Sequence, residues 1–308
     1  MMYFASKTHD RLNGQPFTPE TANVPLCINP YYNVTISNDV PFMIDSGAFQ
    51  DVGLENRLSF KEALNRQLEF EKRITPEGRP AYAIVSYDRL VDEQFDGTSQ
   101  IRERVSYDEG IEYVIETIEA ARYLSSQRAR LSPRKLILSC QGTTTEQYLF
   151  CVKEVLKIAT SEDIIGLGGF CIISRSKKVE QQFYEVINQA FPIIAEKGIK
   201  RVHIFGVGII RVLVQAELLG RRYGIECSYD TSSYEVNAVM GRAYDPNKHQ
   251  LTGVFTKEQK KNGYEPPMLA LFNVNMVRHF WTEFRSMPTP DNFIAGWPTS
   301  KSPIGGIE

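Results

Sequence analysis

The segment Val202-His203-Ile204-Phe205-Gly206-Val207-Gly208 shows the pattern that decides the fold, an apolar run that stops abruptly on glycine or polar residues. Five further segments repeat this pattern, at 42–47, 83–88, 136–142, 164–169 and 225–230. Continuous apolar runs are typical of buried parallel strands. Because helical periodicity follows most of these runs, the chain is expected to consist of βαβ units around a parallel sheet.

The spacing of these units predicts an α/β protein, a single (β/α)8 TIM-type barrel over residues 1–308 with irregular loops at its catalytic face. An open doubly wound sheet is the alternative. Residues 1–24 are expected to form a polar lead-in to a short strand at 26–28, residues 242–267 a long polar loop, and residues 286–308 a C-terminal tail. Apolar stripes predict helices at 59–74, 107–123, 145–159, 179–195, 210–222 and 267–284.

Composition restricts the function classes. A formal charge of -2 over 308 residues excludes a globally basic nucleic-acid coat, although a local basic face stays possible. No apolar stretch approaches the ~18 residues that cross a bilayer, and the first residues lack the apolar core of a signal peptide. The cysteines are scattered through apolar runs, and no cysteine or histidine pair has metal-ligand spacing. We therefore expect a cytoplasmic protein with reduced thiols, no metal site and no cofactor.

Two aspartates stand where α/β barrels bind their ligands. Asp45 and Asp230 each come at the end of an apolar run, and partial burial there can raise the pKa of a carboxyl toward the range of a general acid or base. Two carboxylates around one cavity suggest cleavage of a glycosidic bond, in which one forms a covalent sugar ester and the other transfers the leaving-group proton. Either aspartate could instead cap a helix or shape a turn.

The remaining strand ends carry groups suited to a flat ligand with a polar edge. They are two polar tips, three glycines that could expose backbone N–H groups and two rings that could sandwich a base: Asp88, Gln141, Gly168, Gly169, Gly206, Phe49 and Phe205. Each glycine could equally serve a turn, and each ring could belong to the core. His203 alternates within an apolar strand, which predicts a structural role.

Positive residues also follow several strand ends, on the rim where a phosphate backbone could pass. They are Arg89, Arg175, Lys177, Lys178 and Arg211. Solvated surface charge is the alternative for each of them.

The order of these motifs resembles the tRNA-guanine transglycosylase superfamily. Asp45-Ser46-Gly47-Ala48-Phe49-Gln50 is similar to the family motif DSG(G/S)(F/Y)Q, and Gln141-Gly142, Gly168-Gly169, Phe205-Gly206-Val207-Gly208 and Asp230 follow in the family's order. Leu269-Ala270-Leu271-Phe272-Asn273 is similar to the family's (L/T)xHN helix, with Phe272 where His is usual. The resemblance covers most of the chain, from the strand at 26–28 to the last predicted helix, and implies the family's (β/α)8 barrel.

Carried over position by position, the resemblance implies that Asp230 is the nucleophile at C1′ of the target nucleoside. Asp45 would be the acid/base for the departing guanine and for the incoming 7-deazaguanine, such as preQ0 or preQ1. Asp88 and Gln141 would bind the edge of the base. The backbone of Gly168-Gly169 would donate to its carbonyl, and Phe49 and Phe205 would stack on its two faces. A target base in a nucleic acid must be flipped out to be reached.

The resemblance departs from tRNA-acting members at one point. Those usually carry a CxCxxC…H zinc site between the nucleophile and the last helix, whereas residues 242–267 contain no cysteine and only His249. The chain is thus more similar to the branch that places 7-deazaguanines in DNA, in phage and bacterial genome modification; a phage-encoded member would act in the host cytoplasm. DNA is therefore the expected partner and tRNA the alternative. A non-catalytic nucleic-acid-binding subunit, a glycoside hydrolase or another barrel lyase, and any oligomeric state stay open.

Overall fold

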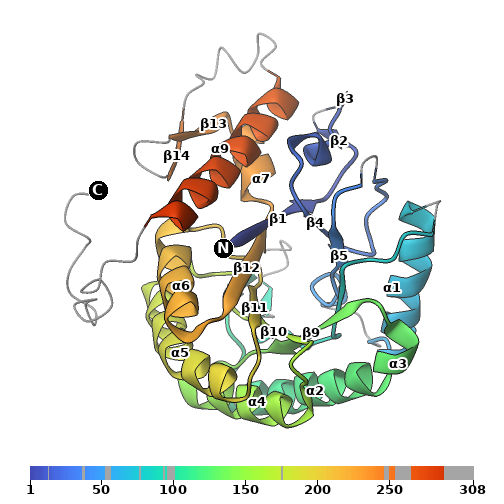
Figure 1. The fold of residues 1–308 in the computed structure, drawn as a ribbon, viewed down its shortest axis with the longest axis vertical. Coiled ribbons are helices and arrows are strands. Elements are labelled where there is room, and N and C mark those ends of the chain that lie inside the picture. The colour runs from blue at the N-terminus through green and yellow to red at the C-terminus, as the bar shows by residue number, and fades with distance from the viewer. Residues whose placement is uncertain are drawn as a thin grey trace.

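The computed structural model describes residues 1–12, 14–36, 39–52, 57–75, 78–92, 94–95, 101–174, 176–245, 250–253 and 265–287. Within these ranges a closed barrel of parallel strands is surrounded by helices, as the sequence predicts (Figure 1). The strands follow one another around the barrel in the order β1 (Met2–Lys7), β12 (Glu226–Thr231), β11 (Arg201–Ile204), β10 (Ile164–Leu167), β9 (Lys135–Cys140), β6 (Ala83–Val85), β5 (Phe42–Ile44) and β4 (Leu26–Ile28).

Every neighbouring pair in this barrel is parallel, and β4 pairs back onto β1. The closure rules out the open doubly wound sheet and leaves the (β/α)8 barrel. All strands then point their carboxyl ends to the same side, which brings the predicted strand-tip residues to one face of the molecule.

Residues 2–7 correct the prediction of a polar lead-in, because they form β1, the strand that closes the barrel. Two polar residues at the end of this strand hid it in the sequence. Ser6 contacts a carboxylate of the neighbouring strand, and Lys7 is 1 % exposed with its ammonium 2.9 Å from the buried carboxylate of Glu20. A buried lysine is tolerated when it is paired in this way.

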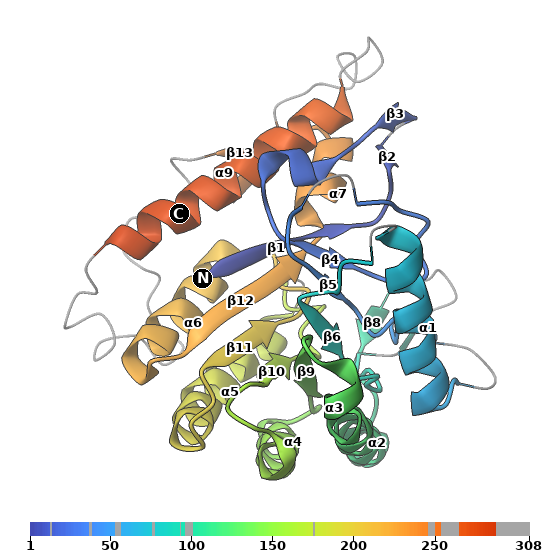
Figure 2. The same ribbon diagram turned by 45° about the vertical axis from the view of Figure 1, so that its right-hand side comes forward.

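Helices cover the outside of the barrel (Figure 2). The predicted helices are confirmed, with ends shifted by a few residues: α1 (Phe60–Ile74), α2 (Tyr107–Ser126), α4 (Thr145–Ile158), α5 (Lys177–Glu196), α6 (Ile210–Tyr223) and α9 (Pro266–Ser286). Ser59 begins α1 and Ser106 begins α2 with a capping box, in which the serine and the glutamate three residues later satisfy each other's backbone N–H groups. Two shorter helices, α3 (Arg128–Leu131) and α7 (Ser233–Val239), complete the described helical layer.

The segments between strands and helices contain further structure. β2 (Arg11–Leu12), β3 (Gln15–Pro16) and the 3-10 helix η1 (Pro19–Ala22) lie between β1 and β4, and β7 (Gln94–Phe95) pairs with β8 (Ile101–Glu103) after β6. The predicted loop at 242–267 is corrected in part, because β13 (Arg242–Asp245) and β14 (Gln250–Gly253) form an antiparallel hairpin there. Most of the predicted tail, residues 288–308, lies outside the described residues.

The C-terminal helix fastens this hairpin to the barrel. Asn273 of α9 is fully buried; its carbonyl accepts from the backbone N–H of Tyr244 at 2.7 Å and its amide donates to the carbonyl of Arg242 at 3.0 Å. Further along α9, the indole N–H of Trp281 donates to the hydroxyl of Tyr229 in β12 at 2.7 Å. Asn273 therefore has a structural role.

A cluster of apolar side chains fills the inside of the barrel. Two of its members, Cys27 and Val85, border a cavity at the carboxyl ends of the strands. Two others, Phe4 and Ile164, border a second cavity, of about 400 Å³, at the amino ends. The two cavities are thus separated by packed side chains. Within the ranges given above, each helix is too short or too polar to span a bilayer.

Candidate active site

A cavity of about 260 Å³ opens at the carboxyl ends of the barrel strands. The three acidic strand-tip residues predicted from the sequence all line it: Asp45, Asp88 and Asp230. They stand on one arc of the barrel, since Asp230 lies in β12, Asp45 follows β5 and Asp88 follows β6, with β1 and β4 between the first two. The parallel register therefore assembles one acidic site from segments far apart in the sequence.

Asp230 is held by hydrogen-bond donors on both carboxylate oxygens. Oδ1 accepts from the backbone N–H of Gly206 at 3.1 Å and lies 3.2 Å from Nε2 of His203, while Oδ2 accepts from the hydroxyl of Ser6 at 2.8 Å. The side chain is 13 % exposed, so the carboxylate reaches the cavity. It makes no capping bond to α7, whose N-cap residue is Ser232 and which has no side-chain cap. The helix-cap alternative for Asp230 is therefore wrong.

Asp45 faces the same space from the other side of β1 and β4. The amide of Asn29 donates to its Oδ2 at 2.9 Å. Burial raises the pKa of Asp45 and the charge of Asp230 raises it further, whereas hydrogen bonds from Ser46, Asn29 and Gly47 act in the opposite direction. A raised pKa is the direction expected of a carboxyl that exchanges protons with a ligand. Because Asp45 is within electrostatic reach of Asp230, the two belong to one site.

Asp88 has a strongly raised pKa. Burial raises its pKa to about 7; the charge of Asp45 adds to the effect and the guanidinium of Arg57 opposes it. The hydroxyl of Ser46 donates to its Oδ1 at 3.3 Å, and Arg57 donates to its backbone carbonyl at 2.7 Å. A carboxyl that is partly protonated at neutral pH can donate a hydrogen bond as well as accept one.

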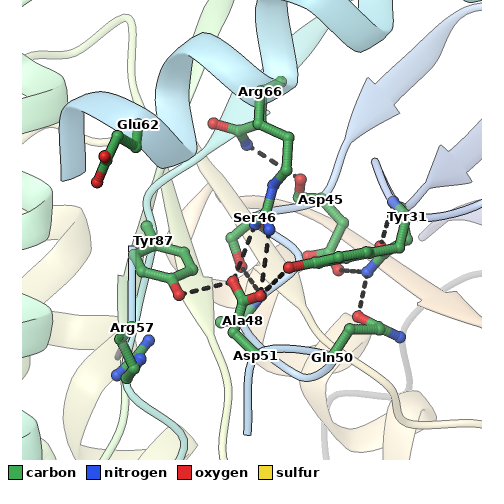
Figure 3. Close-up of polar contacts among 12 residues, drawn as sticks. Tyr31, Asp45, Ser46, Ala48, Gln50, Asp51, Arg57, Glu62, Arg66 and Tyr87 are labelled. Atoms are coloured by element: carbon green, nitrogen blue, oxygen red, sulfur yellow. Dashed lines mark hydrogen bonds and ion pairs between the residues drawn. The ribbon is translucent and has the colours of Figure 1, made fainter. Parts of the chain in front are cut away.

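The turn that carries Asp45 into the cavity is held from behind by Arg66 of α1 (Figure 3). Its Nη2 donates to the carbonyl oxygen of Ser46 at 2.8 Å and to Asp51 at 3.1 Å. Gly47 has φ +78°, and a Cβ on it would lie 2.7 Å from this same nitrogen. Only glycine fits both the left-handed conformation and the space, which is the local reason for the Asp-Ser-Gly sequence.

Asp51 is the centre of the network behind the turn (Figure 3). It is fully buried and accepts hydrogen bonds from the hydroxyls of Tyr31 and Tyr87 as well as from Arg66. Although burial acts the other way, these donors hold the pKa of Asp51 below its ordinary value. Two guanidiniums cover the rings, Arg66 at 4.3 Å from the centroid of Tyr31 and Arg57 at 4.7 Å from that of Tyr87. The network makes the turn a rigid support.

The glycines and rings predicted for base binding also border the cavity: Gly168, Gly169, Gly206, Phe49 and Phe205. Phe205 is half-buried because its ring occupies the space above Gly166, where a Cβ would lie 2.5 Å from the ring. Phe49 is 40 % exposed on the opposite rim. The two rings therefore border the cavity from strand ends on opposite sides of the barrel.

Gln141 is not among the described residues that line the cavity. Its side chain is fully buried behind Gly169, where Oε1 accepts from the backbone N–H of Val91 at 3.2 Å and the amide donates to the hydroxyl of Thr117 at 2.8 Å. Both ends of the amide are used in these bonds. We therefore correct the predicted base contact: Gln141 holds the segment after Asp88 against β9.

Two of the predicted phosphate-binding cations contact protein groups on the outer helices. Arg89 packs 4.4 Å from the ring centroid of Tyr113, and Arg211 forms an ion pair with Glu180. Lys177 and Lys178 are exposed in the first turn of α5, a helix that begins on the carboxyl-end side of the barrel.

Arg175 lies outside the described residues. Of the predicted cationic rim, Lys177, Lys178 and Arg211 are exposed, Arg211 while paired with Glu180, and exposure is what a nucleic-acid contact requires.

Three residues that contact the aspartates were not predicted. Asn29 directly follows the predicted strand at 26–28. Asp45 was predicted as a site residue because it follows a strand, and the same reasoning applies to Asn29. Ser6 was concealed in the missed strand β1. His203 is fully buried, in agreement with a structural role, yet its ring also reaches the carboxylate of Asp230. Nothing in its alternating position within the strand distinguishes it from a core residue.

No group of three or more His, Cys, Asp or Glu side chains in the described ranges is placed to hold a metal ion. His249, the histidine of the interval 242–267, lies outside those ranges.

Comparison with known proteins adds little to this geometry. No protein-family model and no curated protein matches the chain. Two similar solved structures come from the pyruvate carboxylase of Rhizobium etli, both at 10% identity. The enzyme with the allosteric activator acetyl coenzyme-A gives a TM-score of 0.34 over 92% of this chain and 27% of that chain. The carboxyl transferase domain with pyruvate gives a TM-score of 0.33 over 94% and 50%. The chain spans half or less of these structures, and so weak a similarity says nothing about function.

Proposed function

We propose that the protein is a base-exchange transglycosylase that replaces guanine in DNA with a 7-deazaguanine. The observation that carries the proposal is the pair Asp45 and Asp230, which line one cavity from either side of β1 and β4. One carboxylate is fixed by donors and the other has a raised pKa, the division of roles that retaining cleavage of a glycosidic bond requires. The resemblance to the tRNA-guanine transglycosylase superfamily supplies the substrate class.

In the proposed reaction a lone pair of Asp230 forms a bond to C1′ of the target nucleoside, and the electron pair of the glycosidic bond leaves with guanine. Asp45 gives the departing guanine a proton. The incoming 7-deazaguanine returns a proton to Asp45 and attacks C1′, so that the carboxylate of Asp230 leaves. Two displacements at one carbon retain its configuration, which explains why both acids are needed.

The cavity supports a ligand of this kind. At about 260 Å³ it lies just below the lower end of the range for small-molecule sites, which suits a bicyclic base with its sugar. Asp88 can both donate to and accept from the edge of the base, and Phe49 and Phe205 border its faces. The target nucleotide must be extruded from its stack to enter.

The choice of DNA over tRNA rests on the interval 242–267, which has no cysteine for the zinc site of tRNA-acting relatives. The exposed Lys177 and Lys178 offer positive charge for a phosphate backbone of either polymer. Such an enzyme would work in the cytoplasm, that of the host if a phage encodes it.

The proposal is tested by incubating the purified protein with DNA, or with tRNA, and labelled preQ0 or preQ1. Label is expected in DNA, and Asp230→Asn should abolish its incorporation. Asp10→Asn is the matched control, because Asp10 is a surface aspartate paired with Lys7 outside the cavity. A covalent adduct between nucleic acid and the peptide that contains Asp230 should be recovered from the wild-type protein.

The outcomes separate the alternatives. Label in tRNA alone would change the polymer but keep the chemistry. Release of free guanine without incorporation would point to a hydrolase, and binding of nucleic acid without either product would point to an accessory subunit; both results overturn the exchange reaction.

A further inference from the structure

The imidazole of His203 lies inside the barrel with both ring nitrogens in contact with polar groups. Nε2 is 3.2 Å from Oδ1 of Asp230, and Nδ1 is 2.9 Å from the hydroxyl of Ser228. The ring is fully buried and packs edge to face against Phe4 and Phe205, at centroid distances of 5.8 and 4.6 Å. Packing therefore fixes the orientation of the ring, and it does so directly beside the carboxylate of Asp230.

The contacts assign the tautomer of this histidine. An ionised Asp230 can only accept hydrogen bonds, so Nε2 of His203 must carry the proton that it donates. The hydroxyl of Ser228 has one proton, which it can give to Nδ1 at 2.9 Å or to the carbonyl of Val202 at 3.3 Å. The shorter contact favours donation to Nδ1, which leaves His203 neutral with its proton on Nε2.

The two oxygens of Asp230 are then unequal. Among the described residues, Oδ1 receives two N–H donors on fixed frames, the imidazole of His203 and the backbone of Gly206, whereas Oδ2 receives one donor, the hydroxyl of Ser6. A hydroxyl can rotate away from its acceptor, but a packed ring and a backbone N–H cannot. Hydrogen bonds also lower the nucleophilicity of the oxygen that accepts them, so Oδ2 is the freer nucleophile.

We propose that His203 is a positioning residue that holds Oδ1 of Asp230 and so directs attack through Oδ2; this assignment rests on the proposed function. Oδ2 forms the bond to C1′ while the electron pair of the glycosidic bond leaves with guanine, which takes a proton from Asp45. Oδ1 becomes the carbonyl oxygen of the glycosyl ester and keeps its two donors. When the incoming base attacks C1′, the electron pair of the C1′–Oδ2 bond returns to a carboxylate that the same donors stabilise.

The hydrogen bond itself can be tested without activity, by nitrogen NMR of protein labelled in its histidine rings. The signal of His203 is identified by its loss in His203→Gln. Wild-type protein should show the tautomer protonated on Nε2, and Asp230→Asn should shift the Nε2 signal. A tautomer protonated on Nδ1 would overturn the inference, because no proton would then face Asp230.

The consequence for the reaction is tested with two variants in the base-exchange assay. Glutamine keeps an N–H near the place of Nε2, whereas leucine keeps the volume and removes the donor. His203→Gln should stay within about tenfold of wild-type kcat, and His203→Leu should lose about tenfold to a hundredfold with little change in KM, as for loss of one hydrogen bond to a charged group. Equal losses in the two variants, or losses confined to KM, would overturn the positioning role.

The two failures are distinguishable. A histidine protonated on Nε2 in a protein that exchanges no base would overturn the proposed function. A histidine protonated on Nδ1 in a protein that does exchange bases would overturn only the assignment of His203.

Discussion

Replacing Asp88 with asparagine should stabilise the folded protein, and the gain should grow as the pH rises. The pKa of Asp88 is raised from 3.8 to about 7 by burial and by the charge of Asp45. A carboxyl whose pKa is higher in the folded chain favours folding when protonated, and this contribution is lost as the pH rises toward the folded pKa. Asparagine has the shape of the acid but keeps the neutral form at every pH.

The magnitude follows from the two pKa values. Each pH unit between 3.8 and about 7 is worth about 1.4 kcal/mol, so ionised Asp88 lowers the free energy of unfolding by about 4 kcal/mol at pH values above the folded pKa. At about pH 5 the free energy of unfolding has fallen only by the amount that corresponds to the interval from 3.8 to 5. The free energy of unfolding of Asp88→Asn relative to wild type should therefore increase by about 3 kcal/mol between about pH 5 and about pH 8.

Urea unfolding of both proteins at a series of pH values measures this difference. Asp51→Asn is the matched control, because Asp51 is also buried but has a lowered pKa. The ionised carboxylate of Asp51 stabilises the folded protein at every pH above the pKa of an unfolded aspartate, and this stabilisation is lost only in acid. Asp51→Asn should therefore destabilise the protein by an amount that stays constant between about pH 5 and about pH 8. A constant difference for Asp88→Asn as well would refute the assignment of a raised pKa.

Three further substitutions test the fold. Gly166→Ala places a Cβ 2.5 Å from the ring of Phe205 and should cost about 1–3 kcal/mol in urea unfolding; an unchanged midpoint would contradict the close packing. Lys7→Met removes the ammonium 2.9 Å from buried Glu20 and should cost about 3–5 kcal/mol, most of which the double variant Lys7→Met with Glu20→Leu should recover. If the single variant unfolds like wild type, the buried pair is absent. Ser59→Ala should cost about 1 kcal/mol by loss of the α1 cap, while Ser59→Asp retains most of the stability; equal losses would argue against the capping role.

Most of the fold follows from local sequence. Apolar runs that end on polar or glycine residues mark every barrel strand from β5 onward, because buried parallel strands need no alternation. The short strand β4 is also predicted, at 26–28. The strand β1 is not predicted by this pattern, because contacts with residues distant in the sequence determine its polar residues. Its last residues, Ser6 and Lys7, are polar because they meet Asp230 and Glu20, residues that no local pattern connects to them.

The candidate site divides in the same way. Asp45, Asp88 and Asp230 could be predicted because strand ends of a parallel barrel share one face. The role of Gln141 could not, since its burial depends on Val91 and Thr117 in other segments. Side-chain direction at a strand end is set by such partners and not by the strand.

The hydrogen bond from Ser6 to Asp230 joins residues 224 positions apart. During synthesis β1 leaves the ribosome long before β12 exists. The backbone groups of β1 that pair with β12 therefore stay unpaired while the intervening units fold. Contacts of such long range form late and slowly. A polypeptide released before β12 would expose two open sheet edges, which favours association with other chains. Closure of the barrel therefore decides when this contact forms: the hydroxyl of Ser6 meets the carboxylate of Asp230 only when the whole ring of strands has been made.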